Sequence, residues 1–129
     1  MRILLDTHVL IWAVADSDRL TPDIAEVLQE TANDVLFSAA SIWEIAIKYR
    51  LKQPRFMYEP NEIARVALET GFVELPVHAA VAASVATLPL HHRDPFDRLL
   101  VAQALAEPAA LFTADAQLEP YSDLVRRIA

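Results

Sequence analysis

Short apolar runs alternate with helix-like segments along the chain, and this alternation constrains the fold more than any other feature. Parallel strands need long crossover connections, so strands separated by helices predict an α/β fold, a parallel β-sheet with helices on both faces. Residues 1–129 have the length of one domain and are expected to form one. The expected strands are residues 2–5, 34–39, 72–76, 110–114 and, as a possible last strand, 124–129. The expected helices are residues 8–15, 21–33, 40–51, 61–71, 78–88 and 95–107.

The composition excludes several classes of site. Gly71 is the only glycine, whereas a P-loop and a dinucleotide-binding turn each need several glycines. The chain has no cysteine, which excludes disulfides, a thiol nucleophile and cysteine-bound zinc. No apolar run is long enough to span a bilayer, and the N-terminal run lacks the cleavage site of a signal peptide. We therefore expect no membrane association and a cytoplasmic location.

The net charge of −7 at first argues against a nucleic-acid partner, because phosphates bind positive charges. The distribution of the charges matters more than their sum, and here the positive charges are clustered. The segment 48–55, KYRLKQPR, has four basic residues and no acidic one. The segment 91–98, HHRDPFDR, places two histidines and two arginines around two aspartates. Each cluster is either a solvated basic surface or a set of contacts to phosphate.

Several acids lie at the expected junctions between strands and helices. Asp6 and Asp115 each end an apolar strand, where an aspartate either caps the next element or takes part in a site. Asp94 followed by Pro95 has the form of an N-cap before the first helical residue, and Asp94 is interpreted as structural. Asp97 then falls in the first helical turn, where the helix dipole favours an ionised carboxylate that is able to hold a cation.

Glu44 has two interpretations. Ser41 and Glu44 have the spacing of a capping box, and Glu44 with Lys48 forms a favourable helical ion pair. If the helix instead starts at Ser38, Glu44 lies in its second turn among apolar residues. A glutamate in such surroundings needs a partner.

The joint placement of these acids predicts a metal site. In a parallel sheet the strand-to-helix junctions lie along one edge, where ligands bind. Like charges gathered there repel one another unless a cation neutralises them, and oxygen ligands favour Mg²⁺ or Mn²⁺ over zinc. The four histidines lack the spacing of a zinc motif, and His91 and His92 are interpreted as polar surface or substrate contacts. The predicted site residues are Asp6, Glu44, Asp97 and Asp115.

Four segments, in their order and spacing, resemble the PIN-domain ribonucleases, and among these the VapC toxins of bacterial toxin–antitoxin pairs. They are LLDTHVLIW, SAASIWEIAIK, HHRDPFDRLLVAQA and LFTAD. The resemblance runs from Met1 to Tyr121 and implies a single PIN-like domain. The metal-binding acids of the family fall on Asp6, Glu44, Asp97 and Asp115, of which Asp115 matches the most variable position.

The resemblance implies a Mg²⁺-dependent endoribonuclease, with Mn²⁺ as a substitute, that cleaves a cellular RNA. It also implies a homodimer that is inhibited by a cognate antitoxin protein. On this hypothesis Asp6 and Asp97 bind the metal directly, and Glu44 completes the coordination or orients the attacking water. Asp115 binds the metal directly or through a water molecule.

Two alternative functions use the same acids. One is an α/β metal-binding module without catalysis. Calorimetry with Mn²⁺ tests for the site, because a module that has no site should show no saturable binding. The other is an aspartyl-phosphate phosphotransfer domain with Asp6 as the acceptor. The segment LLDTH resembles the start of the haloacid-dehalogenase family, but that family has a second aspartate where this chain has His8, and a later lysine, whereas this chain has no lysine beyond Lys52. Separately, Thr7 and Thr113 are expected to hydrogen-bond to the acids or to the substrate, and helix capping explains Thr7 equally well.

Large apolar residues follow the basic segment. Phe56, Met57 and Tyr58 come directly after Arg55, and Trp43 lies upstream. A partner covers such residues in one interpretation, and the resemblance suggests an antitoxin segment that folds on binding. In the other interpretation they pack inside the domain or at the homodimer interface.

Overall fold

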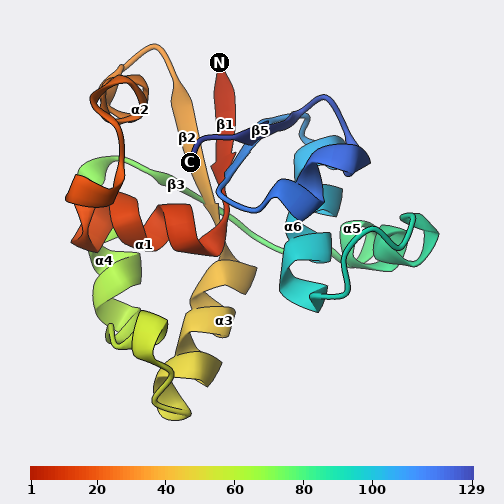
Figure 1. Ribbon diagram of the computed structural model, residues 1–129, viewed down its shortest axis with the longest axis horizontal. Coiled ribbons are helices and arrows are strands. Elements are labelled where there is room, and N and C mark those ends of the chain that lie inside the picture. The colour runs from red at the N-terminus through yellow and green to blue at the C-terminus, as the bar shows by residue number, and fades with distance from the viewer.

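The computed structural model describes residues 1–129 and contains one parallel sheet of five strands (Figure 1). The strand order is β3-β2-β1-β4-β5, and every neighbouring pair is parallel. The central strand β1 therefore lies between β2 and β4. These observations confirm the predicted α/β fold. The strands are β1 Arg2–Leu5, β2 Asp34–Ser38, β3 Val73–Leu75, β4 Ala110–Thr113 and β5 Val125–Arg127.

Helices connect the strands, and local sequence explains where several begin and end. Thr21 caps α2 and Asp94 caps α6, each with proline as the next residue, and Gly71 ends α4 with a φ of 100°. The expected helix 21–33 is shorter in the structure, because Glu30 already has an extended backbone. None of the helices combines the length and the apolar character needed to cross a membrane. The helices are α1 Thr7–Ala15, α2 Pro22–Gln29, α3 Ala39–Arg50, α4 Pro60–Thr70, α5 Ala79–Ser84 and α6 Pro95–Ala106, with 3-10 turns η1 Ser17–Arg19, η2 Pro54–Phe56, η3 Val85–Thr87 and η4 Ala116–Tyr121.

Two apolar clusters cover the two faces of the sheet, as predicted. Ile3 of β1 packs in the cluster that includes α1, α2 and α4, whereas the adjacent Leu4 packs in the cluster that includes α6. Alternation along a strand sends successive side chains to opposite faces. Burial of each such side chain stabilises the fold by roughly 1.5–3 kcal/mol. The strand ends, and the residues that follow them, are therefore held in fixed positions.

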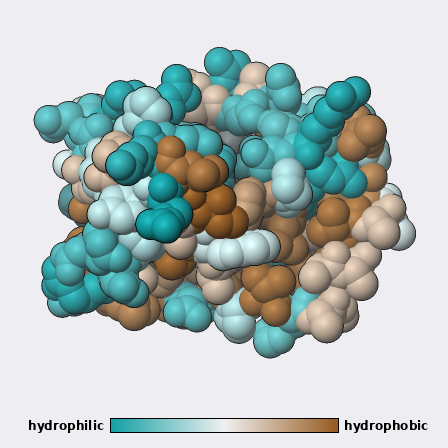
Figure 2. Space-filling view, turned by 90° about the horizontal axis from the view of Figure 1, so that it is seen from below, coloured by the Kyte–Doolittle hydropathy of each residue, from teal (hydrophilic) through white to brown (hydrophobic).

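The structure decides the environment of the apolar residues near η2. Phe56 is 3% exposed and packs in the cluster with α1 and α4, so its ring lies inside its own domain. Trp43 and Met57 are 62% and 56% exposed, and Tyr58 is partly buried against the same cluster. Figure 2 shows the molecule from below, the side on which α3 lies in Figure 1, with apolar residues in a broken band across this face.

Candidate metal centre

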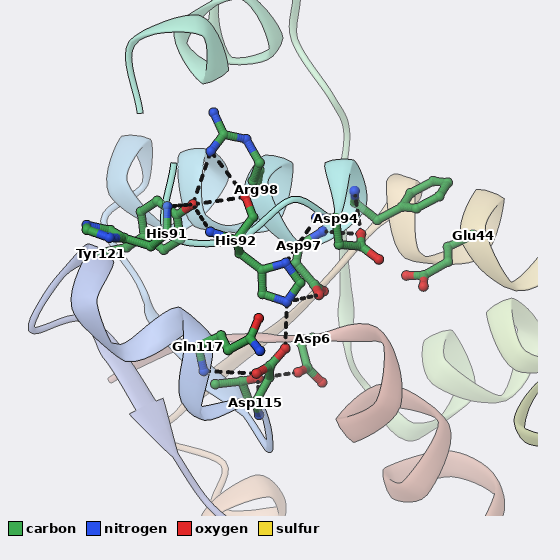
Figure 3. Close-up of polar contacts among 12 residues, drawn as sticks. Asp6, Glu44, His91, His92, Asp94, Asp97, Arg98, Asp115, Gln117 and Tyr121 are labelled. Carbon is green, nitrogen blue, oxygen red and sulfur yellow. Dashed lines mark hydrogen bonds and ion pairs between the residues drawn. The ribbon is translucent and has the colours of Figure 1, made fainter. Parts of the chain in front are cut away.

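The four predicted acids line one cleft at the carboxyl edge of the sheet. Its volume of about 680 Å³ lies within the range of ligand-binding sites. Asp6 follows β1 and Asp115 follows β4, while α3 and α6 supply Glu44 and Asp97. Figure 3 shows these carboxylates approaching one another from four different elements. The predicted convergence of the strand-to-helix junctions therefore holds in the structure.

Asp6 both caps a helix and lies in the acid cluster. Its Oδ1 accepts a hydrogen bond of 2.8 Å from the Val9 amide, and its Oδ2 accepts one from the Thr113 hydroxyl. The residue is 4% exposed. The pKa of Asp6 is raised to about 6, mainly because the carboxyl is buried. The hydrogen bonds from Thr113 and Val9 oppose this rise in pKa, whereas the charge of Glu44 adds to it. The expected contact between Thr113 and the acids is confirmed.

Glu44 lies in the second turn of α3, because Ser38 is the N-cap of this helix. The capping-box interpretation is wrong: Ser41 is helical, and its hydroxyl accepts a 3.0 Å hydrogen bond from Thr7. Glu44 is 4% exposed. Its Oε2 pairs with Lys48, as the helical spacing predicts, whereas its Oε1 is buried and has no hydrogen-bond partner.

Asp97 is the third residue of α6, where its sequence position predicts it. The side chain of Asp94 accepts hydrogen bonds from the amides of Phe96 and Asp97, which confirms Asp94 as the N-cap. Burial, followed by the charges of Asp94, Asp6 and Glu44, raises the pKa of Asp97 to about 7. The negative charges of the cluster therefore act on one another in the folded protein.

His92 joins the acids, a contact that the sequence did not indicate. Its Nε2 lies 2.7 Å from Oδ2 of Asp115 and 3.5 Å from Oδ2 of Asp97. Asp115 also caps the turn η4, because its Oδ1 accepts a 2.9 Å hydrogen bond from the Gln117 amide. His91 is exposed and does not line the cleft, so the two histidines point different ways, as predicted.

The two basic segments are divided between the cleft and the rest of the molecule. Lys48 and Arg55 of segment 48–55 line the cleft, together with Arg19 and Arg127. Arg98 of segment 91–98 does not, because its guanidinium donates to backbone carbonyls before α6, at distances of 2.9–3.4 Å. The cleft therefore combines an acidic cluster with basic side chains around it.

A parallel α/β domain with acids gathered at the carboxyl edge of its sheet defines a class of protein, and comparison with known proteins identifies the family. Residues 3–124 match the PIN domain family. The chain therefore belongs to the PIN domain family. Its structure is also similar to a chain in the crystal structure of VapBC2 from Rickettsia felis bound to a DNA fragment from their promoter. The TM-score is 0.72 at 17% identity, over 97% of this chain and 96% of that chain. This likeness shows the fold.

A second similarity is confined to part of the chain. Enterobactin synthase component F of Shigella flexneri and of Escherichia coli (strain K12) are each 40% identical to it over 67 residues, or 51% of this chain. The chain spans only 5% of the length of these curated relatives. So short a shared segment carries no argument about function.

Proposed function

We propose that this chain is a Mg²⁺-dependent endoribonuclease and the toxin of a VapC-type toxin–antitoxin pair that acts in the cytoplasm. The observation that carries this proposal is the buried Oε1 of Glu44, which has no hydrogen-bond partner. An unpaired carboxylate oxygen is costly to bury unless a cation compensates for the lost hydration. In Figure 3 the carboxylate of Glu44 points toward the side of the cluster where Asp94 and Asp97 lie.

The donor set fits a hard divalent cation. Asp6, Glu44, Asp97 and Asp115 offer only oxygen atoms, the ligands that Mg²⁺ and Mn²⁺ prefer. Burial and mutual repulsion raise the pKa values of Asp6 and Asp97 to about 6 and about 7, and a bound cation would reverse this effect. Residues that served only as helix caps would gain nothing from lying so close together.

Each acid has a proposed role in holding the ion. Asp6 and Asp97 would bind it directly, and Glu44 would complete the coordination or orient the attacking water. Asp115, whose side chain is 37% exposed, would bind it directly or through a water molecule. When bound, Mg²⁺ lowers the pKa of water and offsets the charge that develops on the phosphate.

The basic residues of the cleft support a nucleic-acid substrate. Arg19, Arg55 and Arg127 line the same cleft as the acids. A guanidinium group matches the geometry of a phosphate and stays charged at any physiological pH. Phosphates on either side of the scissile bond would bind these arginines, while the acids hold the cation at the reacting phosphate.

An exposed apolar surface supports a protein partner. Trp43, Leu51 and Met57 are 62%, 65% and 56% exposed, and they lie on or next to α3 and η2. We propose that an antitoxin segment lays apolar side chains over them. The similar Rickettsia felis structure is named as VapBC2, which is consistent with such a partner. The resemblance to VapC also implies a homodimer.

Cleavage of RNA by the purified chain, free of antitoxin, tests the proposal. The protein should cleave a structured RNA with Mg²⁺ or Mn²⁺, and EDTA should stop the reaction. The products should carry 5′-phosphate and 3′-hydroxyl ends, because a water molecule, and not the 2′-hydroxyl of the RNA, would attack the phosphorus while the 3′-oxygen leaves. Products that end in cyclic phosphates would contradict the mechanism. Asp97→Asn serves as the inactive control. Asp123→Asn, which changes an exposed residue, should cleave the RNA normally.

A further inference from the structure

Both ring nitrogens of His92 have hydrogen-bond partners, and together these partners define which nitrogen carries the proton. Nδ1 lies 3.0 Å from the backbone amide of Asp94, and Nε2 lies 2.7 Å from Oδ2 of Asp115. A backbone amide only donates, so Nδ1 accepts and has no proton. The proton of the ring is therefore on Nε2, which donates to Asp115 (Figure 3).

This arrangement argues against His92 as a metal ligand. The ligand atoms of His92, Asp97 and Asp115 lie within 4.8 Å of one another, close enough to hold one ion. A ring nitrogen must give up its proton to bind a metal, and the Asp94 amide prevents the proton from moving to Nδ1. We propose that His92 is a positioning residue that orients the carboxylate of Asp115 toward the cation without binding it. This inference rests on the proposed function, because it requires the acid cluster to hold a metal.

Asp115 is the most exposed of the four acids, so packing alone does not fix the orientation of its carboxylate. Its side chain is 37% exposed, and the only other hydrogen bond to its carboxylate comes from the Gln117 amide to Oδ1. The bond from His92 to Oδ2 restricts rotation of the carboxylate. Outer-shell hydrogen bonds of this kind orient metal ligands.

His92 is itself held by η4, the element that Asp115 caps. Tyr121, the last residue of η4, accepts hydrogen bonds through its hydroxyl from the amides of His91 and His92, at 3.1 and 2.9 Å. Arg98 donates to the same hydroxyl at 3.1 Å (Figure 3). His92, the cap residue Asp115 and Tyr121 at the end of η4 therefore form one connected network.

Two substitutions separate the two hydrogen bonds of the His92 ring. His92→Asn keeps an acceptor for the Asp94 amide, but its side chain is too short to reach Asp115. His92→Gln places a donor close to the position of Nε2. We expect the affinity for Mn²⁺, measured by calorimetry, to fall by about 10–100-fold in His92→Asn and to recover largely in His92→Gln. His91→Asn is the matched control and should leave the affinity unchanged.

A double-mutant cycle tests whether His92 acts through Asp115. His92→Asn should cost little Mn²⁺ affinity in a protein that already carries Asp115→Asn. Equal losses in the two backgrounds would overturn the proposal. A signal from a nitrogen bound directly to Mn²⁺, in pulsed electron paramagnetic resonance, would also overturn it. Similar urea unfolding midpoints for the His92 variants would exclude a general loss of structure as the cause.

The proton position is measurable without metal or RNA. In the metal-free protein, ¹⁵N spectra should show that Nε2 of His92 carries the proton and Nδ1 does not, and the reverse would overturn the proposal. If the protein binds Mn²⁺ and the effects of His92→Asn and Asp115→Asn are coupled, but no RNA is cleaved, the proposed nuclease activity is refuted and the role of His92 stands. If RNA is cleaved but the effects of the two substitutions are independent, only the role of His92 is refuted. A wild-type protein that binds no Mn²⁺ would refute both.

Discussion

The buried carboxylate of Asp6 should lower the stability of the metal-free protein at neutral pH, and Asp6→Asn should restore it. Folding raises the pKa of Asp6 from 3.8 to about 6, mainly because the group is buried. A raised pKa means that the folded state binds the proton more tightly than the unfolded state does. The contribution of Asp6 to stability is therefore fully present below pH 3.8 and is lost as the pH rises through 6.

The expected effect can be worked out from this rise. From 3.8 to about 6 it corresponds to a loss of roughly 3 kcal/mol of unfolding free energy by pH 8. Asparagine caps α1 as well as aspartate does and removes the buried charge. Its amide nitrogen cannot accept the hydrogen bond from Thr113, which offsets about 1 kcal/mol of the gain. The net stabilisation at pH 8 is about 2 kcal/mol, or roughly 6–10 °C in Tm.

Urea unfolding of both proteins in EDTA, at pH 3.5 and pH 8, measures this difference. The gain in Asp6→Asn should be about 2 kcal/mol at pH 8 and should vanish or reverse at pH 3.5, because protonated Asp6 carries no charge. Asp123→Asn, at an exposed position, should show no such pH dependence. Saturating Mn²⁺ should favour the wild type at pH 8, since only the intact cluster gains stability from binding. A variant no more stable than the wild type at pH 8 would refute the reasoning.

Four further predictions concern other parts of the site and its surroundings. Asp97→Asn should abolish cleavage of labelled RNA, while its unfolding midpoint at pH 8 stays unchanged or rises, because a repelling charge is lost. Thr113→Val should lower the urea unfolding free energy by about 1–3 kcal/mol, since it removes the donor to Asp6, and Thr113→Ser should cost less. Phe56→Ala should cost about 3–5 kcal/mol in the same assay because its ring is buried. Trp43→Ala should change stability by less than about 1 kcal/mol and weaken antitoxin binding in calorimetry; unchanged binding would contradict the proposed surface.

Much of the fold could be predicted because its strands are short apolar runs and several helices have local start signals. Thr21 with Pro22 and Asp94 with Pro95 mark such starts, and the structure has helices at both. The C-terminal limits were harder to predict. The expected helix 21–33 ends at Gln29, because side chains bond to the backbone in place of further helical hydrogen bonds: Glu30 accepts from the Ala32 amide, and Asn33 donates to the Val27 carbonyl.

The candidate site could be predicted as far as it depends on topology. The environments of Phe56 and His92 depend on contacts that no local pattern encodes. Phe56 reaches the core after a turn in which Lys52 has a φ of 57°, an uncommon conformation for a lysine. His92 meets Asp115 across 23 residues of sequence, and only its bond to the amide two residues on is local.

Capping and metal binding are compatible roles at the carboxyl edge of a parallel sheet. The sequence positions of Asp6 and Asp115 fit either a cap or a site residue, yet each of the two caps an element and lines the cleft. The backbone amide that binds Oδ1 also holds each carboxylate in one orientation. The other oxygen, Oδ2, accepts a hydrogen bond from Thr113 in Asp6 and from His92 in Asp115. Asparagine keeps the cap and removes the charge. A loss of cleavage in Asp6→Asn without a loss of folding would therefore separate the two roles within one residue.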